Sequence, residues 1–169
     1  MRILLTVIAD KSGGTPEIEP LADALSEAGH QVDLFVAPFE AHKTSEFEFN
    51  ELKKQLRHTV NVINPDVIEC LSMDNIARAL RDLGYAYILD LSDKNDDFKL
   101  SAEEDVAQQQ IIHNASFIFT QNEIQRSELS KALHIENKKI VTMPFSVDMD
   151  LIAQRLAYYQ QMLVRHSLH

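Results

Sequence analysis

Short apolar runs alternate with amphipathic helical stripes along almost the whole chain, and this alternation limits the fold more than any other feature of the sequence. The apolar run at residues 2–8 is followed by a helical stripe at residues 18–28, and the next apolar run spans residues 31–37. Strands that alternate with helices are joined by crossover connections and therefore lie parallel. The sequence predicts an α/β, Rossmann-like three-layer sandwich with a mostly parallel sheet of six or seven strands.

Start and stop signals indicate where the later elements begin and end. Gly29 and Gly84 supply left-handed helix stops, and Pro65 breaks a helix. Asn122 and Asp148 are typical N-cap residues. Further strands are predicted near residues 66–70, 85–91, 116–120 and 139–143, and helices near residues 49–63, 76–83, 101–113, 122–133 and 148–163.

The length of 169 residues suits one domain with a substantial core. The sequence contains no internal repeat and no linker rich in Gly or Ser. We therefore expect one Rossmann-like domain over residues 1–150. Residues 151–169 are expected to form a C-terminal helix that packs on this domain or on a partner, either a second copy or a separate domain.

Charge and cysteine content narrow the class of partner and the compartment. A formal net charge of -10 with no basic run argues against nucleic acid, which is bound mainly through clustered Lys and Arg. The apolar runs are too short for a transmembrane segment, and no signal peptide is recognised. A single cysteine, Cys70, cannot form an internal disulfide, so a cytoplasmic location is expected.

Metal binding is not expected. The histidines are scattered without ligand spacing. The acidic loop after the fourth strand does match several positions of an EF-hand calcium loop, but Phe98 stands where that motif needs glycine for a sharp turn. A strand rather than a helix also precedes this loop, so we predict no metal site.

Five segments, in order, resemble the N-terminal domain of family-4 glycosyltransferases of the GT-B fold. The stretch SGGTPEIEPLADALSEAGHQVDLF is similar to the family's Gly-Gly loop, first helix and second strand. The stretches DVIECLS, YILDLSD and NASFIFTQNEIQRSELSKAL are similar to its later strands and the helix after them. The last segment, KKIVTMPFSVDMDLI, resembles the hinge region, with Phe145 and Ser146 where the family usually has Asn and Gly.

The resemblance implies an acceptor-side domain of a retaining, metal-independent glycosyltransferase. In that family a C-terminal domain holds the nucleotide-sugar donor, and this chain contains no counterpart of it. The implied partners are a sugar or glycolipid acceptor and a C-terminal donor-binding domain or partner chain, with a homodimer as a further option. No cofactor is expected for this chain, and alone it should be inactive.

Two glycines and a histidine are candidate residues for binding the acceptor or a phosphate. Gly13 and Gly14 lie between the first strand and a helix N-terminus, where free N–H groups and the helix dipole favour an anionic or hydroxyl-rich ligand. A tight turn that needs a positive φ is the structural alternative. His42 follows the second strand, on the side where the resemblance places an acceptor.

Two acidic residues are candidate catalytic groups. Asp93 follows the fourth strand at its carboxyl end, the edge where open α/β sheets bind ligands. By the resemblance it is the first candidate for the general base that accepts the proton of the acceptor hydroxyl. Asp90 is the second candidate. For Asp93 the alternative is a solvated loop acid or a capping group, and for Asp90 a strand-end residue bonded to backbone.

Two other functional classes stay open at this point. The altered hinge favours a non-catalytic binding or assembly module that kept the glycosyltransferase fold. A flavodoxin-like receiver or nucleotide-binding protein is more distant, because the chain has neither a phosphate-cradling G-x-G-x-x-G loop nor an acidic cluster after the first strand.

Overall fold

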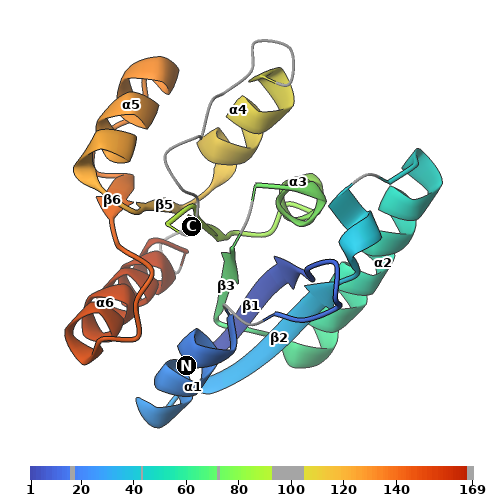
Figure 1. The fold of residues 1–169 in the computed structure, drawn as a ribbon, viewed down its shortest axis with the longest axis horizontal. Helices are drawn as coiled ribbons and strands as arrows, with labels where there is room; N and C mark the ends of the chain where they lie inside the picture. Colours follow the sequence, from blue (N-terminus) through green and yellow to red (C-terminus); the bar gives the residue numbers. More distant parts are fainter. Residues whose placement is uncertain (16–17, 43, 72, 93–104, 167–169) are drawn as a thin grey trace.

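In the part of the chain that the computed structural model describes, which omits residues 16–17, 43, 72, 93–104 and 167–169, six strands form one sheet. The strand order is β2-β1-β3-β4-β5-β6, and every neighbouring pair is parallel. The predicted α/β, Rossmann-like sandwich is therefore confirmed (Figure 1). The strands are β1 (Arg2–Ile8), β2 (Gln31–Ala37), β3 (Val67–Cys70), β4 (Ile88–Asp90), β5 (Phe117–Thr120) and β6 (Ile140–Thr142).

Helices cover both faces of this sheet. The helices are α1 (Ile18–Glu27), α2 (Glu46–Ile63), α3 (Asn75–Asp82), α4 (Asp105–Asn114), α5 (Glu123–Leu133) and α6 (Met149–His166), with a short 3-10 helix η1 (Phe39–His42) after β2. Buried residues of α1 and α6 belong to one core cluster, and those of α2, α3, α4 and α5 belong to the other. The strand order reverses between β1 and β3, and open α/β sheets bind their ligands at the carboxyl ends near such a reversal.

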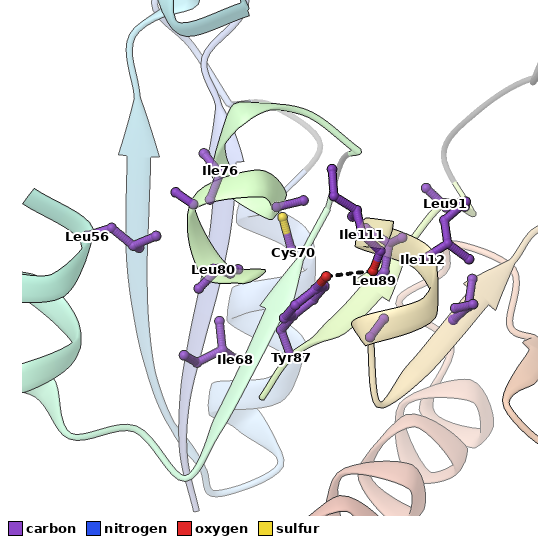
Figure 2. Packing of buried hydrophobic residues seen from close by; sticks show 14 of the residues in the cluster. Leu56, Ile68, Cys70, Ile76, Leu80, Tyr87, Leu89, Leu91, Ile111 and Ile112 are labelled. Atoms are coloured by element: carbon purple, nitrogen blue, oxygen red, sulfur yellow. Dashed lines mark hydrogen bonds between the residues drawn. The ribbon is translucent and has the colours of Figure 1, made fainter. Parts of the chain in front are cut away.

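The central strands are mostly apolar because both of their faces are buried, whereas the edge strand β2 is partly exposed. In β1, Leu4 and Ile8 point into the α2–α5 cluster, while Ile3 and Leu5 point into the α1 and α6 cluster. Figure 2 shows the larger cluster, where the Tyr87 hydroxyl donates a 2.6 Å hydrogen bond to the backbone carbonyl of Ile111 in α4. This bond satisfies a phenol inside an otherwise apolar core.

Element ends follow the sequence signals, with one informative difference. The predicted N-caps are confirmed, since the Asn122 side chain accepts from Gln125 and that of Asp148 accepts from Asp150. The fourth strand is shorter than the predicted 85–91, because the Tyr85 N–H donates to Leu80 at 3.1 Å and so completes the end of α3. This bond, with Gly84 at φ 73, is the geometry of a Schellman cap.

Helix α6 packs beside α1 on the same face of the sheet. Its Tyr158 ring meets the rings of Phe117 and Phe119 edge-on, at centroid distances of 5.3 Å and 5.9 Å. Ile152 and Met162 of the same helix are buried in the α1 and α6 cluster. That α6 also meets a second domain or a second copy of the chain stays a prediction, as does the boundary at residue 150.

Candidate functional site

A shallow pocket of about 510 Å³ opens at the carboxyl ends of β1 and β2. The loop after β1 forms one wall, and the end of β2 with the start of η1 forms the other. Its lining is Ala9, Asp10, Lys11, Ser12, Gly13, Val36, Ala37, Pro38 and Glu40. The pocket thus combines two carboxylates and one ammonium group with a short apolar strip, next to the strand-order reversal.

The loop after β1 is organised by the Asp10 side chain. Its Oδ1 atom accepts hydrogen bonds from the Ser12 N–H at 2.8 Å, the Ser12 hydroxyl at 2.6 Å and the Gly14 N–H at 3.0 Å. The Gly13 N–H donates to the Asp10 carbonyl at 3.0 Å. Both glycine N–H groups that sequence reasoning offered to a ligand are therefore already bonded within the loop.

These bonds also keep Asp10 charged. The Ser12 hydroxyl, with help from the Gly14 N–H, holds the pKa of the Asp10 carboxyl below its ordinary value. Asp10 is solvent-exposed, and within the described residues its Oδ2 atom accepts no hydrogen bond. Asp10 therefore presents an ionised oxygen that can accept a hydrogen bond from a ligand in the pocket.

Only one of the two glycines is required by the backbone. Gly13 has φ 83, a left-handed conformation that L side chains adopt at a cost. A Cβ atom at Gly14 would lie 3.5 Å from Ser12 Oγ, which is ordinary van der Waals contact. The tight-turn alternative thus accounts for glycine at position 13. At position 14 the backbone and the surrounding space would also accept a residue with a side chain.

The other candidate residues lie at different distances from this pocket. His42 is the last residue of η1, which begins one residue after Pro38 of the pocket wall. Asp93 lies outside the described residues. Asp90 is the last residue of β4. Because β3 lies between β4 and β1, the axes of β4 and β1 are roughly 10 Å apart across the sheet.

Asp90 is 2% exposed, and its carboxylate accepts hydrogen bonds from Ser92 and Arg155. Its Oδ1 atom accepts from the Ser92 N–H at 2.8 Å and from the Ser92 hydroxyl at 2.5 Å. Its Oδ2 atom accepts from Arg155 Nη1 of α6 at 2.8 Å. These bonds match the structural alternative for Asp90 and extend it to a buried arginine.

Sequence reasoning did not identify the buried network to which Asp90 belongs. Arg155 also bonds Glu69 of β3, and the Tyr159 hydroxyl donates to the same carboxylate. One signal was available, since Glu69 interrupts the apolar run VIEC, and an unpaired charge in a buried strand is costly. Arg155 itself falls three residues after Ile152 and four before Tyr159, so the three share one face of α6.

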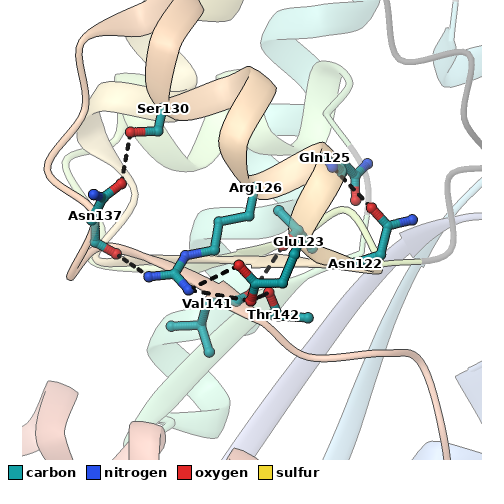
Figure 3. A network of polar contacts seen from close by, with 9 residues as sticks. Asn122, Glu123, Gln125, Arg126, Ser130, Asn137, Val141 and Thr142 are labelled. Atoms are coloured by element: carbon teal, nitrogen blue, oxygen red, sulfur yellow. Dashed lines mark hydrogen bonds and ion pairs between the residues drawn. The ribbon is translucent and has the colours of Figure 1, made fainter.

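A second concavity, of about 370 Å³, lies beside α5. Figure 3 shows that its charged groups mostly bond one another. Arg126 pairs with Glu123 at 3.2 Å and donates to the Asn137 carbonyl, while the Ser130 hydroxyl donates to the Asn137 side chain at 2.8 Å. Glu123 also accepts from the Thr142 hydroxyl. These bonds tie α5 to β6 and to the turn before it.

Two searches over the described residues gave no candidate. No group of three or more His, Cys, Asp and Glu side chains in that part of the chain lies in positions to hold a metal ion. No helix of the described part combines the length and apolar character needed to cross a membrane.

Solved structures provide the link to known proteins. No protein-family model and no curated protein sequence matches the chain significantly. The UDP-GlcNAc 2-epimerase of Methanocaldococcus jannaschii matches with a TM-score of 0.65 and 15% identity, over 85% of this chain and 45% of that one. The Neisseria meningitidis enzyme bound to UDP-GlcNAc gives 0.62 and 10%, over 99% and 52%. The Rickettsia bellii enzyme gives 0.58 and 14%, over 94% and 48%.

At these identities the likeness shows the fold alone. The chain shares a GT-B-like, Rossmann-type fold with these structures and spans about half of their length. A GT-B-like fold agrees with the coarser part of the sequence prediction. Membership of glycosyltransferase family 4 stays a prediction.

Proposed function

We propose that this chain is the acceptor-binding half of a GT-B glycosyltransferase of family 4. The observation that carries the proposal is the pocket at the carboxyl ends of β1 and β2, which the ionised Asp10 side chain lines. Two further findings support it: the GT-B-like fold, and the ordered sequence segments that resemble the family. The structures of similar fold are enzymes of UDP-GlcNAc, and this chain corresponds to about half of each.

The charges of the pocket favour an uncharged sugar as the acceptor. Asp10 and Glu40 outnumber Lys11, and the N–H groups of the glycine loop are bonded to Asp10. A phosphate would meet two carboxylates and few available donors, whereas a sugar hydroxyl can donate to Asp10 Oδ2. Val36 and Pro38 offer an apolar strip to a sugar ring or to the first carbons of a glycolipid.

The reaction proposed for the complete enzyme is sugar transfer from a nucleoside diphosphate donor held by another domain. The acceptor oxygen forms a bond to the anomeric carbon of the donor sugar. The bond from that carbon to the diphosphate breaks, and the diphosphate leaves with the electron pair. The hydroxyl proton passes to a carboxylate, for which Asp93 is the first choice because Asp90 is occupied by Ser92 and Arg155.

A titration followed by backbone amide NMR tests the acceptor site. The probes are methyl glycosides of glucose, galactose, mannose and N-acetylglucosamine, with glucose 1-phosphate and UDP-GlcNAc for comparison. At least one glycoside should shift the amide signals of Ser12, Gly13 and Gly14 in a saturable way. Asp10→Ala should weaken that binding by roughly tenfold or more, because a hydrogen bond to a charged group is lost.

The matched control is Asp23→Ala, an exposed aspartate on α1 away from the pocket lining, which should bind as the unchanged protein does. The proposal fails if no glycoside shifts these signals. A second candidate function, the corresponding half of a sugar-nucleotide epimerase, is favoured by the structures of similar fold. Shifts at the same amides with UDP-GlcNAc alone would support that candidate instead.

A further inference from the structure

Four ionisable side chains are buried together between the sheet and α6. They come from three elements that are distant in sequence. Each has an exposed fraction of at most 2%: they are Glu69 of β3, Asp90 of β4, and Arg155 and Tyr159 of α6. Burying this many polar groups is costly unless they bond one another, so the stability of this region depends on the bonds within the cluster.

One guanidinium serves both carboxyl groups. Arg155 Nη1 donates to Glu69 Oε1 and, at 2.8 Å, to Asp90 Oδ2. The Tyr159 hydroxyl donates to the remaining oxygen of Glu69. Among the described residues, Arg155 Nη2 has no hydrogen-bond partner. The Cζ atom of Arg155 lies 5.0 Å from the ring centroid of Phe119, which adds a cation–π contact.

The two carboxyl groups and the single cation do not balance when all of them are ionised. The cluster then carries a net charge of minus one in a site closed to solvent. One proton on the carboxyl pair makes the cluster neutral, and like charges that share a buried site favour that proton. Glu69 is the natural holder, because Asp90 already accepts two hydrogen bonds from Ser92 and can accept a further one from the protonated Glu69 carboxyl.

The surrounding elements supply no second cation among the described residues of the core. The buried side chains of α1 are apolar: Ile18, Leu21, Ala24 and Leu25. On β5 the neighbours are Phe117 and Phe119, and from β1 Ile3 and Leu5 face the same cluster. The groups that face Glu69 are therefore Arg155 and Tyr159 from α6 and Asp90 from β4.

We propose that this cluster is a proton-linked latch that docks α6 on the sheet. With one proton on Glu69 the cluster is neutral and α6 is held. When that proton leaves at alkaline pH, a net negative charge is buried under α6 and the helix is held less firmly. The latch acts on α6, which begins directly after residues 144–148, where the sequence resembles a hinge.

The direction in which stability changes with pH follows from the raised pKa of the Glu69 carboxyl. Burial, opposed by Arg155 and reinforced by Asp90, raises the pKa of Glu69 from its ordinary value of 4.5 to about 8. In this interval the folded protein holds a proton that the unfolded chain has released, so stability falls as the pH rises from about 4.5 to about 8. Below the interval the contribution is fully present, and above it the contribution is lost.

Hydrogen exchange of α6 amides, measured at pH 6 and pH 9, tests the latch. The ratio of the exchange rate of each α6 amide to its intrinsic rate at the same pH removes the intrinsic pH dependence of exchange. In the unchanged protein this ratio should rise by about tenfold or more, since each pH unit inside the interval changes the equilibrium by up to about tenfold. Glu69→Gln, a neutral isostere, should abolish the rise. Glu128→Gln, an exposed glutamate on α5, should preserve it.

Direct titration of the Glu69 carboxyl carbon by NMR in the unchanged protein completes the test and does not need a variant that folds. A midpoint clearly above that of exposed glutamates supports the latch. A midpoint at or below theirs overturns the proposal, and so does an α6 exchange ratio that is equal at the two pH values. Neither outcome bears on acceptor binding, so the latch and the proposed function can fail separately.

Discussion

Replacing Arg155 with methionine is expected to lower the free energy of unfolding by about 3–5 kcal/mol at neutral pH. The substitution keeps most of the side-chain volume and removes the one cation among the described residues that pairs with Glu69 and Asp90. Both carboxyl groups then lose their charge-assisted bonds while they stay buried. Urea unfolding followed by circular dichroism measures the change.

The matched control is Arg126→Met on α5. Arg126 also pairs with a glutamate, but its side chain is 33% exposed and that of Glu123 is 70% exposed. Exposed pairs contribute little, so a loss of no more than about 1 kcal/mol is expected. If Arg155→Met costs no more than this control, α6 is not held by the buried pairs.

Phe119→Ala is expected to cost about 3–5 kcal/mol, the usual cost of removing a fully buried aromatic ring. Phe119 is 0% exposed and lies under α6, where its ring meets Tyr158 edge-on and faces the Arg155 guanidinium. The cavity would open where the sheet, the helix and the charge cluster meet. A thermal or urea unfolding curve reports the loss.

Phe47→Ala provides the comparison on the same residue type. Phe47 lies in the first turn of α2 and is 74% exposed, so its removal should change the stability by no more than about 0.5 kcal/mol. A small effect at Phe119, similar to that at Phe47, would show that α6 does not cover β5 as described.

The fold was predictable because its cause is local. Strands buried on both faces are apolar along their length, and helices buried on one face repeat with a period of 3.6 residues. Each pattern can be recognised within about ten residues. Glycine stops such as Gly29 and Gly84 mark where a helix ends before the next strand. The predicted fourth strand was longer than β4, because the cap that joins Tyr85 to the end of α3 is a bond between backbone groups, which side-chain patterns do not indicate.

The buried cluster was not predictable by the same means. In α6 Arg155 is buried, whereas the neighbouring Leu156 is only half-buried. A rule based on hydrophobicity assigns leucine to the core and arginine to the surface. The burial of Arg155 is explained by its bonds to Glu69 and Asp90, which lie 86 and 65 residues away in the sequence.

The candidate site residues stay predictions, and the glycine loop is bonded differently from what the sequence suggested. Sequence reasoning directed attention to the glycine loop after β1, and the pocket does lie there. It treated the N–H groups of Gly13 and Gly14 as available and gave no role to Asp10. An aspartate after a strand often accepts hydrogen bonds from backbone N–H groups a few residues later, as Asp10 does from Ser12 and Gly14. This tendency was the signal that sequence reasoning missed.

The central claim is that this domain binds the acceptor and that the nucleotide-sugar donor is held elsewhere. Calorimetric titration of UDP-GlcNAc, UDP-glucose and GDP-mannose into the isolated chain tests it most directly. The account predicts no saturable heat with any of the three donors at millimolar concentration. Tight one-to-one binding of any one of them by this chain alone would contradict it.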